Sequence, residues 1–231
     1  RAPDLSESLT LEPVAKSATP CPGWAVVGTC DAGHEFAREV YCGQEWCVTC
    51  GQRGSGAHKR RIARWLPRAR QLKTMGYLVI TYPLDVRWRL KDRATLDWVY
   101  ARTLEVLAGK RMGRRGRVAG YWKRGLARWH WFGDTPGKWH PHLNVLVDGG
   151  KLPEETLSQL RDDLARVVGY RWIQIHYEYS SEQNQMAGWI EYLTRPTFTN
   201  RAWSELAADT LYGFRSARAR GKWTGLPVWQ P

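Results

Sequence analysis

The chain has 231 residues and a net charge of +13, with 35 Lys and Arg against 22 Asp and Glu. Its 43% hydrophobic and 25% charged residues are typical of a soluble globular protein and exclude collagen-like, wholly disordered and membrane-spanning classes. Most of the cations are Arg, and 14 Trp and 10 Tyr accompany them. Because guanidinium groups bind phosphates and aromatic rings stack on unpaired bases, a nucleic acid is the favoured partner, with Trp-rich core packing as the alternative.

Composition divides the chain into four stretches. We predict a flexible polar arm over 1–19, a Cys-rich zinc-binding module over 20–56, an alternating body over 57–214 and a basic tail over 215–231. The arm has no apolar core of a secretory signal, and the longest apolar stretches, such as 77–80, are far below the roughly 18 residues of a membrane span. Five Cys, an odd number, suit metal binding in a reducing cytoplasm better than a disulfide framework.

The body opens with cations spaced around an apolar stripe over 57–70, which predicts a basic amphipathic helix. Residues 76–83, GYLVITYP, have the β-branched and aromatic content of a buried strand. A helix with apolar residues at helical spacing follows and ends at Gly109. The loop KRMGRRGR over 110–117 then offers phosphate contacts, or is a solvated run of charge.

The second half of the body alternates in the same way. Strands are expected over 117–122, 127–132 and 139–147, and a GDTPG turn joins the last two. A helix over 153–168 and a half-buried strand over 171–179 follow. This order predicts an α+β fold with a central, mainly antiparallel five-stranded sheet and helices on one face, beside a small N-terminal zinc-binding module.

Two histidines lie two residues apart in the predicted strand over 139–147. Alternate side chains of a strand share a face, so His140 and His142 can reach one ion. His130 on the neighbouring strand is the best-placed third ligand, and Asp134 in the turn is the reserve. Imidazoles with open positions suit Mg²⁺ or Mn²⁺ acting on a phosphodiester. The structural alternative is two hydrogen-bonded histidines on an edge strand, where Pro141 is permitted.

Such chemistry needs a nucleophile, and a helix over 180–196 offers one. Ser180 and Gln183 are spaced as a capping box at its start. Helical spacing places Tyr192 on the flank of the buried stripe, where it can project into a cleft. Gly188, one turn earlier, leaves room for a DNA backbone. Position alone does not distinguish this residue from the other tyrosines.

Three segments carry a resemblance to a known family. GYLVITYP (76–83), WHPHLNVLV (139–147) and GWIEYLTR (188–195), in this order and at these separations, resemble the three motifs of rolling-circle replication initiator (Rep) proteins of the HUH endonuclease superfamily. The similarity covers roughly residues 76–196. It implies a five-stranded antiparallel sheet with the metal-binding histidines on its central strand.

The resemblance also implies roles for individual residues. By it, His140 and His142 bind the divalent ion, and His130 takes the place of a third ligand that is often a Glu. Tyr192 stands in the place of the nucleophile, with Arg195 three residues on. Similar Cys-rich modules precede the catalytic region in several Rep families and related transposases.

The chain departs from the family pattern at two positions. Gly188 stands four residues before Tyr192, where many members have a second Tyr or a Glu, and Glu191 stands where a Lys is usual. A two-tyrosine mechanism is therefore not expected. Glu191 and Glu182 are the alternatives for a carboxylate that activates water to end replication.

The second constellation consists of Cys and His at metal-ligand spacings. Its members are Cys21, Cys30, His34, Cys42, Cys47 and Cys50. Thiolates two to four residues apart are typical of structural zinc, because one turn can then bind the ion from both ends. We predict Cys30, Cys42, Cys47 and Cys50 as zinc ligands, with His34 and Cys21 as substitutes. The module is expected to depend on the metal for its folding.

Together these features predict a metal-dependent, site-specific endonuclease and strand transferase. It would nick single-stranded or hairpin DNA at an origin through a 5′-phosphotyrosine and so initiate rolling-circle replication of a plasmid or phage. A rolling-circle transposase with the same chemistry and a non-catalytic, zinc-containing nucleic-acid-binding protein are the alternatives. No GxxxxGK[ST] motif is present, so a host helicase and polymerase are expected partners. The cations expected to contact DNA are Arg60, Arg61, Arg64, Arg114, Arg115, Arg117 and Arg195.

Overall fold

The computed structural model describes residues 25–39, 44, 46–47, 50–109, 120–133, 138–198 and 203–223. The helices are α1 (Gly56–Ala69), α2 (Leu84–Arg89), α3 (Arg93–Ala108), α4 (Glu154–Val168), α5 (Gln183–Thr194) and α6 (Ser204–Leu211). The strands are β1 (Ala25–Thr29), β2 (Glu35–Glu39), β3 (Met75–Thr81), β4 (Gly125–Phe132), β5 (Trp139–Asp148), β6 (Gln174–Ser180) and β7 (Ala217–Arg220). Across these described segments, none of the helices has both the length and the apolar character needed to cross a bilayer.

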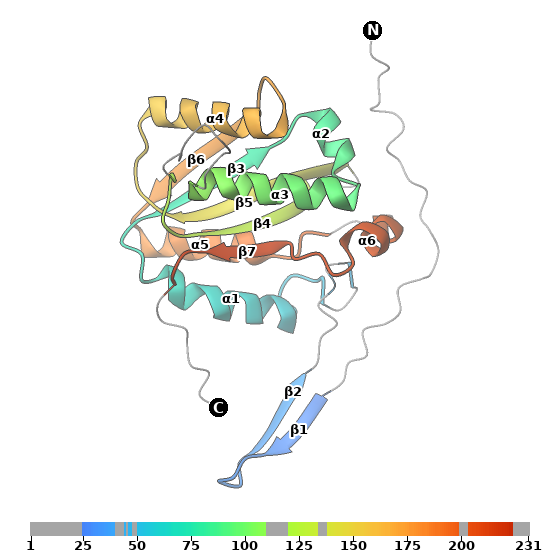
Figure 1. The fold of residues 1–231 in the computed structure, drawn as a ribbon. Coiled ribbons are helices and arrows are strands. Elements are labelled where there is room, and N and C mark those ends of the chain that lie inside the picture. Colours follow the sequence, from blue (N-terminus) through green and yellow to red (C-terminus); the bar gives the residue numbers. More distant parts are fainter. Residues whose placement is uncertain are drawn as a thin grey trace.

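The fold is α+β and is built on a five-stranded antiparallel sheet in the order β6-β3-β5-β4-β7 (Figure 1). A two-stranded hairpin, β1-β2, forms a separate sheet. The predicted antiparallel sheet of five strands is thus confirmed, and β5, which carries two of the candidate histidines, is its central strand. The predicted arm over 1–19 and basic loop over 110–117 lie outside the described residues.

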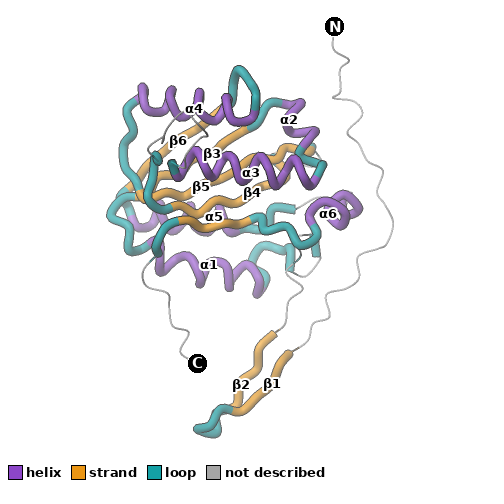
Figure 2. Tube along the Cα trace, in the orientation of Figure 1, coloured by secondary structure: helices purple, strands orange, loops and turns teal. Residues whose placement is uncertain are grey.

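Helices cover both faces of this sheet, and not one face as predicted (Figure 2). Val145 of β5 packs into an apolar cluster with α3 and α4, whereas the next residue, Leu146, packs into a second cluster with α1 and α5. Both side chains are almost completely buried. A strand with cover on both sides is apolar along its whole length, so the sequence of β5 does not distinguish one covered face from two.

The fifth strand differs from the one predicted over 117–122. Its described part, residues 120–122, forms no strand. The Trp122 amide donates instead to the carbonyl of Leu107 over 3.4 Å, so this segment runs against the end of α3. The fifth place in the sheet is taken by β7, which pairs with β4 and comes from the segment predicted as a basic tail.

Local sequence signals set most of the helix boundaries. Gly109 ends α3 and Gly169 ends α4, both with the positive φ that glycine adopts readily. The predicted capping box of α5 does not form. Strand β6 continues through Ser180, whose hydroxyl accepts a hydrogen bond from the amide of Glu182 over 3.0 Å, and α5 begins only at Gln183.

The two-sided cover of the sheet can be tested at Leu146, which is 1% exposed on the face that α1 and α5 cover. Leu146→Ala is expected to lower the free energy of unfolding by about 2 to 5 kcal/mol, because it leaves a cavity under these helices. Urea denaturation gives this value. A loss below about 0.5 kcal/mol, as at an exposed site, would show that this face is uncovered.

Candidate active site

The structure brings the three predicted imidazoles together on the α5 side of the sheet. His130 of β4 and His142 of β5 are direct partners in the strand register, and their ring centres lie 5.4 Å apart. His140 precedes His142 by two residues, and the centres of these two rings are 5.6 Å apart. The alternation of side chains along two paired strands therefore creates this cluster.

Two hydrogen bonds determine which ring nitrogens can bind an ion. His130 Nε2 lies 3.2 Å from the carbonyl oxygen of Leu193, and His142 Nδ1 lies 2.9 Å from that of His140. A carbonyl only accepts, so both nitrogens carry the proton, and in the neutral rings a lone pair remains on His130 Nδ1 and His142 Nε2. These lone pairs are what a metal ion requires.

Burial keeps His130 in its neutral form. The side chain is 1% exposed, and this desolvation, together with nearby His142 and Arg128, holds its pKa well below the ordinary value of 6.5. Its Nδ1 atom is buried and has no hydrogen-bond partner among the described residues. A buried nitrogen with an unshared lone pair fits coordination of a metal ion.

His130, His140 and His142 are the residues that would hold the ion. Within the described ranges, no three His, Cys, Asp or Glu side chains are gathered closely enough to form a metal site by themselves. The reserve ligand Asp134 lies outside those ranges. Water and phosphate oxygens are the usual further ligands of Mg²⁺, which keeps several waters when bound to proteins.

Helix α5 carries Tyr192 to the histidine cluster. The centres of the Tyr192 and His130 rings are 5.3 Å apart. The helix packs on the sheet through Met186, Trp189, Ile190 and Leu193. Tyr192 stands on the flank of this buried stripe, is 37% exposed, and is thus open to a large substrate while touching the cluster.

Arg195 contacts the hydroxyl of Tyr192. Its Nη2 atom donates to the phenolic oxygen over 3.0 Å, and its guanidinium carbon lies 3.9 Å from the ring centre. A cation in this position stabilises negative charge that develops on the oxygen, and it can also bind a phosphate. Arg195, predicted from the sequence only as a DNA contact, therefore contacts Tyr192 directly.

Tyr77 is a neighbour that the sequence does not single out. Its ring stacks on Trp189 with 5.6 Å between centres and meets the edge of Tyr192 at 6.2 Å. Its hydroxyl donates to Oδ1 of Asn144, and burial raises its pKa well above the usual range. Tyr77 therefore stays protonated, and its ring packs against Tyr192 from the sheet. Alternation along β3 predicts which face of the sheet Tyr77 lies on, but no sequence pattern predicts its contacts with Trp189 and Tyr192.

Helix α1 and the residues before it hold the end of α5. Arg61 Nε donates to the carbonyl of Thr194 over 2.9 Å, and Arg53 forms an ion pair of 2.8 Å with Glu191. Arg61, predicted to contact DNA, is thus engaged with the last turn of α5. The hydrogen bond and charge of Arg53 lower the pKa of Glu191, so this carboxylate is already paired.

The other predicted residues are placed as follows. Glu182 precedes the first turn of α5, so about ten residues of helix, or about 15 Å, separate it from Tyr192. Arg60 and Arg64 are exposed on α1. The remaining predicted DNA contacts, Arg114, Arg115 and Arg117, lie outside the described residues.

The described zinc candidates form two separate pairs. Cys30 Sγ and His34 Nδ1 are 3.5 Å apart at the turn between β1 and β2. Cys47 and Cys50 are buried beside the start of α1, where the Cys50 amide donates to Cys47 Sγ over 3.4 Å. The structure therefore pairs Cys30 with His34, the predicted substitute. Cys21 and Cys42 lie outside the described residues.

Residues from the consecutive strands β4 and β5 and from the distant helix α5 thus form one site. Comparison with protein-family models, curated proteins and solved structures gave no match for the chain. The chemistry of the site itself is the basis for assigning a function.

The hydrogen bond from Arg61 to α5 is testable by stability. Arg61→Ala is expected to lower the free energy of unfolding by about 1 to 3 kcal/mol, because the Thr194 carbonyl loses a charged donor. Lys59→Ala, at an exposed position of the same helix, is the matched control and should change it by less than about 0.5 kcal/mol. Equal effects of the two substitutions in urea denaturation would contradict the proposed contact.

Burial of His130 predicts a pH dependence of stability. Because its folded pKa is depressed, only the unfolded chain takes up this proton below pH 6.5, so stability falls with pH in this window. The slope from this residue is at most about 1.4 kcal/mol per pH unit. Urea denaturation in a chelator should show that His130→Gln removes this part of the slope, whereas a slope unchanged by His130→Gln contradicts the buried neutral ring.

Proposed function

We propose that the chain is a metal-dependent nicking and joining endonuclease of the HUH type, which cuts single-stranded or hairpin DNA and initiates rolling-circle replication of a plasmid or phage. The observation that carries the proposal is the meeting of three rings from three elements. Tyr192 of α5 lies 5.3 Å from His130 of β4, which lies 5.4 Å from His142 of β5. The order of the three sequence motifs supports the same conclusion.

In this proposal Tyr192 is the nucleophile. Its oxygen attacks the phosphorus of the scissile phosphodiester and gives up its proton, while the bond from phosphorus to the 3′ oxygen breaks and that oxygen takes a proton. The products are a 5′-phosphotyrosine and a free 3′-hydroxyl. Because one phosphate diester replaces another, the 3′-hydroxyl of a later strand can reverse the step without ATP.

The surrounding residues prepare this step. Arg195 donates to the Tyr192 oxygen and can bind the phosphate that approaches it. A divalent ion such as Mg²⁺ or Mn²⁺, when bound, polarises a non-bridging oxygen of the phosphate. His130 Nδ1 and His142 Nε2 are the nitrogens that would bind such an ion, because the other nitrogen of each ring donates to a backbone carbonyl.

Space and charge at α5 suit a nucleic acid strand. A Cβ atom added at Gly188, one turn before Tyr192, meets no atom within 4 Å, so this side of the helix is open. Helix α1, which packs against α5, carries exposed cations, and the whole chain has a net charge of +13. A single strand is the form in which a phosphate can reach a protein site in line, without a paired strand covering it.

We also propose a structural zinc ion in the Cys-rich module. The Cys47–Cys50 turn supports it, because both thiols are buried and the amide of one residue donates to the sulfur of the other. This turn leads directly into α1 through Ser55, whose hydroxyl donates to the Cys50 carbonyl over 3.0 Å. Loss of zinc is therefore expected to disturb α1 first.

The proposed nucleophile is tested by Tyr192→Phe, which removes only the hydroxyl. With stem-loop oligonucleotides of random loop sequence and Mn²⁺, the unchanged protein should form a covalent DNA adduct that survives a denaturing gel. The substitution should lower adduct formation by at least about a thousand-fold, as removal of a nucleophile does. DNA affinity, measured by fluorescence anisotropy, should change by less than about two-fold, since contacts of cations with phosphates dominate binding and one hydroxyl contributes little.

Tyr179→Phe is the matched control, because this Tyr of β6 is 48% exposed and shares the sheet face of Tyr177, which packs on the side of α3 and α4. It should form the adduct at the unchanged rate. An adduct that persists in Tyr192→Phe, or its absence from the unchanged protein with every oligonucleotide, overturns the proposed function.

A further inference from the structure

Cations and tryptophan rings form a row at the end of the sheet away from Tyr192. We call this set the Arg–Trp row: Arg64, Trp65 and Arg68 of α1, Trp223 after β7, and Arg124 before β4. The Trp65 and Trp223 ring centres are 5.8 Å apart, the guanidinium carbon of Arg68 lies 4.7 Å from Trp65, and that of Arg124 lies 5.6 Å from Trp223. Arg68 is buried and supports Trp65, whereas Arg64 is exposed and the other members are partly exposed. Interleaved cations and rings are the surface that single-stranded nucleic acids bind.

The row is separated from the histidine cluster by the length of α1 and β4. Strand β4 begins at Gly125, next to Arg124, and reaches His130 five residues later, about 17 Å along the strand. Exposed Lys59 and Arg60 lie on the part of α1 nearer to α5's last turn, and exposed Arg64 lies one turn farther on. Exposed cations of α1 thus lie between the contact of this helix with the last turn of α5 and the Arg–Trp row.

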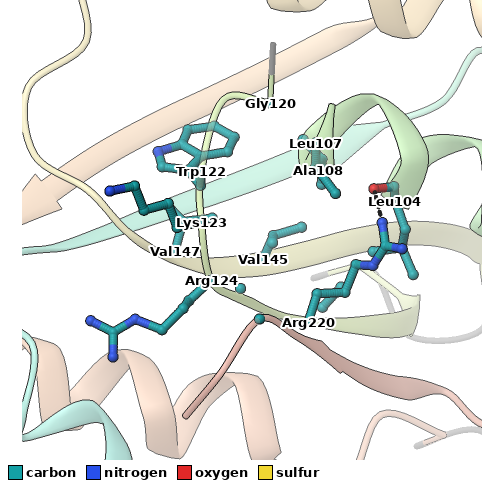
Figure 3. Close-up of a pocket in the computed structure, with 13 residues that line it drawn as sticks. Leu104, Leu107, Ala108, Gly120, Trp122, Lys123, Arg124, Val145, Val147 and Arg220 are labelled. Carbon is teal, nitrogen blue, oxygen red and sulfur yellow. Dashed lines mark hydrogen bonds between the residues drawn. The ribbon is translucent and has the colours of Figure 1, made fainter. Parts of the chain in front are cut away.

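A pocket of about 390 Å³ adjoins the row around the end of β4, on the opposite, α3 side of the sheet, where Leu104, Leu107 and Val145 line it. Arg124 belongs to both, and Arg220, which also lines the pocket, accepts a hydrogen bond from Trp223 Nε1 at its carbonyl over 2.9 Å. Figure 3 shows Val145 and Val147 between the ring of Trp122 and the side chain of Arg220. The volume lies in the range of small-ligand sites, which are mostly apolar with a few polar groups at fixed positions.

The charges of the pocket favour an anionic ligand. Lys123, Arg124 and Arg220 line it, and no carboxylate is among its described lining residues. Arg124 forms an ion pair with Asp148, and Arg220 donates a hydrogen bond to the Leu104 carbonyl. Lys123 forms no ion pair with a described residue. A pocket with apolar side chains, the ring of Trp122 and three cations in its lining suits a flat ring that carries a phosphate, which is the chemistry of a nucleotide.

We propose that the Arg–Trp row and this pocket bind the single-stranded DNA that flanks the scissile phosphate, with phosphates on Arg64, Arg124 and Lys123 and one base in the pocket against Trp122. The proposal rests on the proposed function for the identity of the strand. It adds a second binding region about 17 Å from the reacting phosphate. The strand is held there before and after cleavage, independently of the covalent bond.

Binding of thymidine oligomers of two lengths tests this proposal without any cleavage. An 18-nucleotide oligomer can reach from Tyr192 to the pocket, whereas a 3-nucleotide oligomer has only two phosphate-to-phosphate steps and is too short to span the roughly 17 Å between the two regions. Lys123→Glu and Arg64→Glu should each weaken binding of the long oligomer by about ten-fold and lower its salt dependence by about one phosphate contact. Each should leave the affinity of the short oligomer within about three-fold.

Arg89→Glu supplies the matched control, because it reverses an exposed charge on α2, which contributes no residue to the row or to the lining of the pocket. It should leave both affinities unchanged. Trp122→Leu tests the proposed contact between this ring and a base. Loss of one stacked base should weaken binding of the long oligomer by about five- to hundred-fold. Should Trp122→Leu fail to fold, the two charge reversals decide the question alone.

Long-oligomer affinities that are equal in the unchanged protein and both charge reversals overturn the proposal. So does a duplex of equal length that competes better than the single strand, since the row would then bind paired DNA. Failure of the proposed function has a different signature. In that case Lys123→Glu still weakens the long oligomer, while no oligonucleotide forms a covalent adduct at Tyr192.

Discussion

A hydrogen bond from β4 to α5 joins the two halves of the candidate site. His130 Nε2 donates over 3.2 Å to the carbonyl of Leu193, the residue that follows Tyr192. The bond fixes the imidazole tautomer, so that Nδ1 keeps its lone pair, and it also holds the last turn of α5 against β4. His130 Nδ1, the nitrogen proposed to bind a metal ion, and the hydroxyl of Tyr192, the proposed nucleophile, are therefore positioned together, and a movement of α5 displaces both.

Packing provides the free energy that keeps this bond in place. Four side chains of α5, Met186, Trp189, Ile190 and Leu193, are buried against the sheet. Each contributes about 1.5 to 3 kcal/mol, against about 1 kcal/mol for a hydrogen bond, so burial holds the helix and the hydrogen bond orients it. Tyr192 stays partly exposed because it lies beside the buried stripe. The candidate site therefore combines a rigidly packed helix with an accessible Tyr192 side chain.

Sequence patterns predicted the parts of the site that depend on local periodicity. Alternation along two paired strands placed His130 opposite His142, and helical spacing placed Tyr192 on an exposed flank. Long-range pairing was not predictable in this way. In β7, small Ala residues alternate with Arg, so a run of charge concealed a strand whose Arg218 packs over Tyr100. The contacts of Arg61 and Tyr77 likewise depend on elements distant in the sequence.

The position of β7 has a consequence for how the chain is made. It is the last described strand to leave a ribosome, and it pairs with the outer edge of β4. Until it emerges, the amides and carbonyls of Gly125–Arg128 on that edge have no partner strand, although every element of the catalytic cluster is already synthesised. An open edge of this kind attracts other chains. A product shortened before residue 217 would therefore keep its histidines and its tyrosine and still be prone to aggregate.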